Sequence, residues 1–499
     1  MSTKASSFSA PTHTMALLHG FASPAYTKAG GIPLFMDVLS RDYTGSDFWR
    51  MKDNGDINTK WGIVVGNVGQ GKSAAMKILI MRLLCASAGF NNLRAWINDY
   101  KSEANESEYS KLSKVTQSVV FRMAEMSVNP FESRLFLDKD KKVNYLGLFN
   151  MGELLAEFGK KSQLTSVESV GLTIVLSIMF NMSEEYWAPD LIEKLSRSIT
   201  KEQITSYYRT IDNSLIKKLR ARAAEHSGTK LAEDSLRQAM QYANAADNYS
   251  IEEIQNAAVQ VSFYYHNILH GKNGMIFGSS HSMYDLYVQK TVTRDWRGLD
   301  PDAETLLRII DNIIQMTAID NNRTDLLPHL NADDEMHRPM DVFAYAKSTA
   351  YKSEIARSTF TVNLSATHRL ASIRKGAVGS ELYRYGDTII NNLGFGLIGK
   401  QQNDPVVLNE LADRFRLTKA NKNALPGLPP RHFVYVLGDK ERPRLVRTFA
   451  TPSEIEVLPT NQANDYVLDR PNPYNERDIV RYAEENGFAL QPLGSGGVS

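Results

Sequence analysis

The stretch "WGIVVGNVGQGKSAAMKILIMRLLCASAG", residues 61–89, decides the fold. Its apolar start, "WGIVV", predicts a strand, and its second half predicts a helix that Gly89 closes as a C-cap. Between them lies "GNVGQGKS", which fits the pattern G-x-x-x-x-G-K-[ST]. Glycines let the backbone N–H groups of such a loop converge on one anion, and the following helix adds its partial positive charge. The stretch therefore predicts a P-loop that holds the phosphates of ATP.

Different residues of this loop are expected to bind the phosphates and the metal ion. We expect Lys72 to reach the β- and γ-phosphates and the Ser73 hydroxyl to bind Mg²⁺. The other reading is a glycine-rich turn that happens to precede Lys-Ser, but the flanking strand and helix favour nucleotide binding. The expected nucleotide-binding residues are Gly66, Asn67, Val68, Gly69, Gln70, Gly71, Lys72, Ser73 and Ala74.

Composition leaves the chain in the ordinary range of soluble globular proteins. It has 499 residues, 42% hydrophobic and 23% charged, with a formal net charge of +1. That balance gives no global attraction to nucleic acid or anionic membrane. Cys85 is the only cysteine, so no intramolecular disulfide is possible and a reducing compartment is favoured. We find no apolar run long enough to span a membrane and no secretory signal, and we expect a cytoplasmic protein.

The pattern along the chain predicts an α/β protein with an insertion. We expect a flexible N-terminus (1–30), a first part of the ATPase domain (31–150), a helical insertion (151–275), a second part of the ATPase domain (276–458) and a C-terminal extension (459–499) with a short helix near "ERDIVRYAEEN". Alternation of strands and helices predicts a mostly parallel sheet with helices on both faces.

Hydrolysis also needs an acidic residue for the metal and a group that activates water. One candidate place is "INDYKSE", where Asp99 ends the second strand, as in kinase-like P-loop proteins. The other is "NADDEMH", where Asp334 would hold Mg²⁺ and Glu335 would orient or deprotonate water. An acidic triplet is by itself more often a solvated turn, and its strand contains Pro328. The helix and strand that follow favour the second place, because "TVNLSATHRL" puts His368 at a strand tip where it can sense the γ-phosphate.

The order of these motifs resembles the ATPases of conjugation and type IV secretion, more closely the large ATPase that is the fourth VirB component, within the FtsK/HerA branch of P-loop motors. The resemblance covers about residues 30–455 and rests on an ordered set of short motifs. Three of them match named family motifs: Asp99 to Glu103 in "INDYKSEANE" match a D-P-K-G-E-like sequence, Asn129, Pro130 and Phe131 in "VNPFES" match an N-P-[LF] turn, and Asp334 to His337 in "DDEMH" match a DEAH-like motif. The other segments are "GNVGQGKSAAMKILIMRL", "GKNGMIFG", "RSTFTVNLSATHRLASI" and "YGDTIINNLGFGLIGKQ".

The resemblance implies a RecA-like P-loop NTPase that works as a ring, usually a hexamer, with nucleotide between subunits. An arginine of one subunit would then reach the γ-phosphate in its neighbour, and Arg294, Arg297, Arg357 and Arg369 are the candidates. It further implies membrane-embedded channel proteins as partners, with DNA as another candidate, and a place at the inner face of the cell membrane. Two features depart from the family. His368 stands where many relatives have Gln, and the large N-terminal domain of full-length secretion ATPases is missing before Gly66, so a separate partner could supply it.

Three other functions stay open beside a secretion-type motor. A DNA-pumping coupling protein or FtsK-like translocase would show DNA-stimulated turnover. A low-turnover assembly component would bind ATP only to set its conformation. A kinase-like enzyme would use Asp99 and need a pocket for a small substrate.

Two further segments admit a binding role, and the structural reading is favoured for both. "KKLRAR", residues 217–222, is a basic run that could contact a phosphate backbone, but a solvated helix face is the favoured interpretation. "SFYYHNILH" carries three aromatic residues and two histidines, for which helical core packing is favoured over base stacking or metal binding. No cysteine–histidine spacing suggests zinc.

Overall fold

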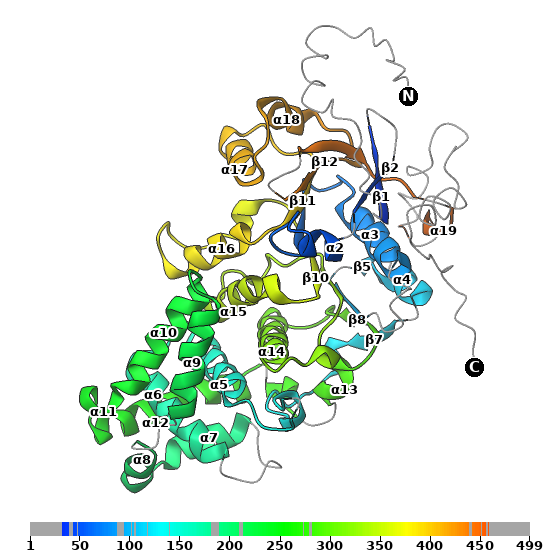
Figure 1. Cartoon of the computed structure of the whole chain (residues 1–499). Coiled ribbons are helices and arrows are strands. Elements are labelled where there is room, and N and C mark those ends of the chain that lie inside the picture. Colours follow the sequence, from blue (N-terminus) through cyan, green and yellow to red (C-terminus); the bar gives the residue numbers. More distant parts are fainter. Residues whose placement is uncertain are drawn as a thin grey trace, which may run out of the picture.

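The computed structural model describes residues 32–38, 43–46, 48–86, 94–100, 102–103, 106–116, 118–138, 140–180, 189–208, 213–272, 274–278, 282–438, 442–450, 452–455 and 458. The expected C-cap at Gly89, the N-terminus, the C-terminal extension and its short helix lie outside these residues. Figure 1 shows a sheet with helices on both faces and a large helical lobe that extends from one side.

Eleven strands of the described chain form one sheet. Their order is β2-β1-β13-β12-β11-β3-β10-β9-β4-β8-β7. The seven strands from β11 to β7 run parallel, and the four at the other end pair antiparallel. The strands are β1 (Ile32–Asp37), β2 (Tyr43–Ser46), β3 (Trp61–Val65), β4 (Ala95–Asp99), β7 (Val119–Arg122), β8 (Thr291–Asp295), β9 (Leu330–Asp333), β10 (Val362–Thr367), β11 (Phe395–Ile398), β12 (His432–Leu437) and β13 (Arg444–Arg447); β5 (Ser102–Glu103) and β6 (Glu106–Ser107) form a separate small hairpin. The mostly parallel sheet predicted from the sequence is therefore confirmed.

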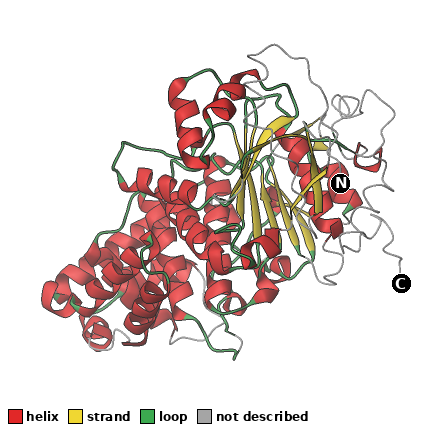
Figure 2. Ribbon diagram, turned by 45° about the horizontal axis from the view of Figure 1, so that its top comes forward, coloured by secondary structure: helices red, strands yellow, loops and turns green. Residues whose placement is uncertain are grey.

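Helices cover both faces of this sheet, as Figure 2 shows. Side chains alternate along β3, so Val64 packs in the core beneath α3 while Ile63 and Val65 join the larger core on the opposite face. The helices outside the lobe are α2 (Phe48–Asp53), α3 (Lys72–Ala86), α4 (Ser110–Val115), α13 (Met283–Tyr287), α14 (Pro301–Asp320), α15 (Phe343–Ile355), α16 (Glu381–Asn391), α17 (Pro405–Phe415), α18 (Lys419–Ala424) and α19 (Pro452–Ile455).

The helical lobe fills the interval between β7 and β8. Its helices are α5 (Tyr145–Lys160), α6 (Ser166–Phe180), α7 (Pro189–Ser198), α8 (Lys201–Tyr208), α9 (Asn213–Glu225), α10 (Lys230–Ala243), α11 (Ala245–Asn248) and α12 (Ile251–Leu269). Local signals fix helix starts here: a capping box between Ser250 and Glu253 begins α12. The first helix starts at Tyr145, a little before the expected start at residue 151, and α5 packs on α14 and α15, next to the sheet.

The strand order decides which residues can meet at the P-loop. Strand β10 lies between β3, which leads into the P-loop, and β9, which leads into the acidic motif. β4, the strand that follows α3 along the chain, is three places from β3, which is about 14 Å at the usual spacing between strands. The β3–α3–β4 segment is thus parallel in direction, but its two strands are not neighbours.

Candidate active site

The P-loop runs from the end of β3 to the start of α3. Gly69 and Gly71 have φ values of 78° and 89°, a region that side chains other than glycine rarely adopt. The Gln70 side-chain amide donates to the carbonyl oxygens of Pro429 (2.8 Å) and His432 (3.1 Å). The loop is therefore held from outside by the residues around the start of β12, which leaves its inner surface to an anion.

Lys72 lies inside the loop and is largely buried. Its Nζ donates to the carbonyl oxygens of Gly66 (2.8 Å) and Asn67 (3.1 Å), and it lies 3.1 Å from Nδ1 of His368. His368 follows β10, the strand beside β3. The lysine and the expected sensor residue are therefore brought into direct contact.

Ser73 and Asp334 meet although they lie 261 positions apart. The Ser73 hydroxyl donates to Oδ2 of Asp334 at 2.7 Å, and Asp334 is buried. A hydroxyl and a carboxylate next to a phosphate-binding loop are the hard oxygen ligands that Mg²⁺ prefers. The two expected metal ligands thus lie together and fit Mg²⁺.

Glu335 continues from Asp334 toward His368. Its backbone N–H donates to Oδ1 of Asp333 at 3.2 Å, and its Oε2 lies 3.5 Å from Nε2 of His337. The ring of His337 is edge-on to that of His368, with 5.7 Å between centroids. Burial lowers the pKa of His337 and favours its neutral form, although the nearby Glu335 opposes this shift. Glu335 is therefore linked through His337 to His368, which contacts Lys72.

Arg308 is a residue of this site that the sequence analysis missed. It lies on α14, is buried, and pairs with Glu304 at 2.9 Å and with Asp333 at 3.6 Å. Its Nη1 also donates to the carbonyl oxygen of Glu335 at 3.5 Å, and its guanidinium lies 4.0 Å from the ring centre of Tyr100. A single arginine among the apolar residues of "TLLRII" was the available signal. Arg308 fixes the backbone that presents Asp334 and Glu335.

Asp99, the candidate of the kinase-like reading, lies on the strand next to that of the acidic motif. It is buried at the end of β4, and its Oδ2 accepts a hydrogen bond from the backbone N–H of Tyr109 at 3.1 Å. Because β10 and β9 separate its strand from β3, Asp334 takes the place at Ser73. Asp334 is therefore the carboxylate in contact with Ser73, and a role for Asp99 on the neighbouring strand stays a prediction.

The four candidate arginines lie in different surroundings. Arg294 is buried, pairs with Asp311 at 2.7 Å and stacks on Trp96, so it cannot reach a neighbouring subunit. Arg297 makes a two-point contact with Asp295, at 2.8 and 2.7 Å.

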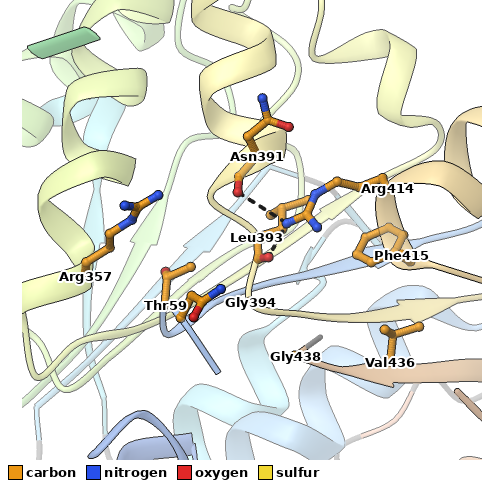
Figure 3. A pocket seen from close by; sticks show the side chains of 10 residues that line it. Thr59, Arg357, Asn391, Leu393, Gly394, Arg414, Phe415, Val436 and Gly438 are labelled. Atoms are coloured by element: carbon orange, nitrogen blue, oxygen red, sulfur yellow. Dashed lines mark hydrogen bonds between the residues drawn. The ribbon is translucent and has the colours of Figure 1, made fainter. Parts of the chain in front are cut away.

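Arg357 and Arg369 lie at opposite ends of β10: Arg357 comes before the strand and Arg369 comes after it. Arg369, next to His368, donates to Gln402 on the P-loop edge. Arg357 is exposed and donates to the side-chain oxygen of Asn392 at 2.7 Å. It lines a cavity of about 70 Å³ at the amino ends of β3 and β11, opposite the P-loop, together with Arg414, whose guanidinium bonds to the carbonyl oxygens of Asn391 and Leu393 (Figure 3).

The basic run of α9 divides between solvent and core. Lys217, Lys218 and Arg220 are exposed, whereas Arg222 is buried and pairs with Asp320 at the end of α14. In "SFYYHNILH", Tyr265 is buried in the helical core while Phe263 is half exposed. Within the described ranges, no helix combines the length and apolar character that a membrane crossing requires.

Comparison with solved structures identifies the fold. VirB4 of Thermoanaerobacter pseudethanolicus superposes with a TM-score of 0.54 at 14% identity, over 87% of this chain and 100% of that one. The fold is the one found in VirB4. Looser matches, each with a TM-score of 0.44 over 85% of this chain and 90% of the other, are the bacterial conjugative coupling protein TrwB in an unbound form, at 11% identity, and the plasmid coupling protein TrwB in complex with ADP and Mg²⁺, at 12% identity. No family model matches the chain, and no curated protein does.

Proposed function

We propose that this chain is an ATP-hydrolysing motor of a conjugative DNA-transfer or type IV secretion apparatus. The observation that carries the proposal is the 2.7 Å contact between Ser73 and Asp334. It joins a P-loop to an acidic motif on a strand two places away, with the strand of His368 between them. The VirB4 fold and the ordered motifs of the sequence support the assignment to a secretion-type motor.

The side chains of the site have separate roles in this proposal. Lys72 binds the β- and γ-phosphates, and Ser73 and Asp334 hold Mg²⁺, which when bound neutralises phosphate charge. Glu335 accepts a proton from the attacking water. The oxygen of that water bonds to the γ-phosphorus while the bond between the γ-phosphorus and the oxygen that leaves with ADP breaks. His368, which contacts Lys72, senses whether the γ-phosphate is present.

We further propose a ring of identical subunits, with ATP between neighbours. Arg357 is the best placed of the four candidate arginines, because it is exposed and lies at the amino ends of the parallel strands, whereas the P-loop lies at their carboxyl ends. Membrane-embedded channel proteins would recruit the ring to the inner face of the cell membrane. DNA is a candidate substrate, and its effect on turnover separates a pump from a secretion-type motor.

The test is steady-state phosphate release by the purified chain, with and without DNA. Glu335→Gln is expected to keep ATP binding and to lose turnover by about 10²–10⁴-fold, the usual contribution of a general base. Glu125→Gln is the matched control, because Glu125 is exposed beyond the end of β7, where its carboxylate pairs with Arg122 at 3.2 Å. Turnover stimulated by DNA would identify a DNA pump. ATP binding without turnover in the wild type would instead identify an assembly component.

A further inference from the structure

Two histidines and a glutamate meet in the helical lobe, away from the P-loop. Nδ1 of His266 lies 3.0 Å from Oε1 of Glu193, and Nε2 of His270 lies 3.1 Å from Oε2 of the same carboxylate. One ligand atom from each of the three residues lies within 4.8 Å of the other two. Glu193 belongs to α7 and the histidines to α12 and its C-cap, two helices that Figure 1 shows at the far end of the lobe from α3.

The helical backbone of α12 brings the two histidine side chains together. Residues four apart on a helix lie on one face, so His266 and His270 point to the same side of α12. Their ring centroids are 4.5 Å apart. Glu193 is 8% exposed, whereas the two histidines are 46% and 59% exposed. A buried carboxylate thus forms the floor of a shallow site, and two half-exposed imidazoles form its walls.

Arg197 shows that this position attracts positive charge. Its Nη2 lies 2.7 Å from Oε1 of Glu193 and 3.2 Å from Nδ1 of His266. A guanidinium nitrogen therefore lies within reach of both the Glu193 carboxylate and the His266 ring nitrogen, which accepts a hydrogen bond in the neutral tautomer that carries its proton on Nε2. Arg197 is 48% exposed and one helical turn from Glu193, and its side chain can turn into solvent.

We propose that Glu193, His266 and His270 form a binding site for a Zn²⁺-class transition-metal ion. Two imidazole nitrogens and one carboxylate oxygen are a ligand set that zinc binds, and histidines four apart on a helix are a known zinc-binding arrangement. Bonds of about 2.0–2.2 Å in a tetrahedral site place ligand atoms about 3.3 Å apart, so only small side-chain rotations are needed. Mg²⁺ is disfavoured, because it prefers oxygen ligands.

The ion would connect two helices that are distant in sequence. Glu193 and His266 lie 73 positions apart, and α7 follows residues 181–188, which lie outside the described chain. A metal bound to both helices fixes α7 on α12. The fourth position faces solvent and is available to water, because both imidazoles are half exposed. The site lies apart from Ser73 and Asp334, so its occupancy is independent of the proposed ATPase reaction.

The experiment measures metal binding by the full chain after removal of metal with EDTA. Zn²⁺ is added in excess Mg²⁺ and without nucleotide, and bound zinc is counted after gel filtration; Co²⁺ is added separately and its visible absorption recorded. The wild type is expected to bind one equivalent of zinc and to give the strong visible bands of tetrahedral Co²⁺. His270→Gln is expected to weaken zinc binding at least tenfold, and so is His266→Gln.

His226→Gln is the matched control, because His226 lies in the same lobe but outside the cluster. It should bind zinc as the wild type does. An unchanged circular dichroism spectrum and melting temperature in EDTA show that each variant is folded. Equal zinc binding by the wild type and His270→Gln, no binding by the wild type, or octahedral Co²⁺ bands would each overturn the proposal. None of these outcomes bears on ATP turnover, so the two proposals can fail separately.

Discussion

Replacing Lys347 tests how the helical lobe is fastened to the catalytic part of the chain. Lys347 lies on α15, and its Nζ is 3.0 Å from Oε1 of Glu153 and 3.0 Å from both carboxylate oxygens of Glu157 on α5. Lys347 is 3% exposed and Glu157 is fully buried. Removing one partner of a buried ion pair costs about 3–5 kcal/mol, because the other charge is left uncompensated. We expect Lys347→Met to lower the free energy of unfolding by about that much at pH 8.

The loss should depend on pH in a defined direction. Burial raises the pKa of Glu157 from 4.5 to about 7, even though Lys347 opposes the shift. Because the folded state holds this proton more tightly than the unfolded chain does, the contribution to stability is fully present below pH 4.5 and is lost as the pH rises to about 7. Without Lys347 the pKa of Glu157 rises further. The variant should therefore be close to the wild type at pH 5, where Glu157 is protonated in both, and furthest from it above pH 7.

The assay is urea unfolding followed by circular dichroism at pH 5 and pH 8, with EDTA present. Adding Glu157→Gln to Lys347→Met should recover more than half of the loss at pH 8, since the fully buried carboxylate is then removed and only Glu153, which is 12% exposed, keeps its charge. Lys194→Met is the control, because Lys194 is exposed and pairs with Asp190 only at the surface, and it should not change stability measurably. A loss that is the same at both pH values, or that Glu157→Gln does not relieve, would refute the reasoning.

Three further predictions concern the P-loop site. His368→Ala should reduce turnover about 10- to 100-fold with little change in ATP affinity, if it acts as a sensor in the transition state; His432→Ala, measured in the same phosphate-release assay, should not. Asp334→Asn should weaken binding of Mg²⁺-ATP but not of metal-free ATP in fluorescence titrations, because the lost charge lies next to Ser73, the other proposed Mg²⁺ ligand. Gly71→Ala should weaken nucleotide binding at least tenfold in the same titrations, because φ at Gly71 is 89°, whereas Gly427→Ala meets no neighbouring atom and should bind normally.

The parts of the fold that follow local rules were predictable from the sequence. "WGIVV" forms β3, the residues after the glycines form α3, and "TVNLSATHRL" contains β10. Each is a continuous apolar or alternating run with a clear start, which is the condition for reading an element from one sequence. Pro328 looked incompatible with the acidic strand, but β9 begins only at Leu330, so the proline lies before it.

The parts that depend on distant partners were not predictable. The sequence of strand β8, "TVTRD", is too polar to predict a buried strand. It is buried because Asp311 of α14 neutralises the charge of Arg294. Arg308 looked like one basic residue in an apolar helix, since its acidic partners come from the next strand and the preceding turn of the helix. The histidine pair gave no zinc signal, because Glu193 comes from another helix of the lobe. A buried polar residue is interpretable only with its partner, and pairing across the fold is not a local property.

The two halves of the proposed catalytic group share one scaffold. Glu335 follows β9, His368 follows β10, and α15 is the helix that connects these strands. Lys347 fastens α15 to α5, the first helix of the lobe, through carboxylates that are buried. Sliding α5 along α15 would separate Lys347 from Glu157 and leave that carboxylate buried without a cation, which costs about 3–5 kcal/mol. A change at the proposed nucleotide site that moves α15 should therefore carry α5 with it as one body, so that the lobe follows β9 and β10 rather than slipping over them.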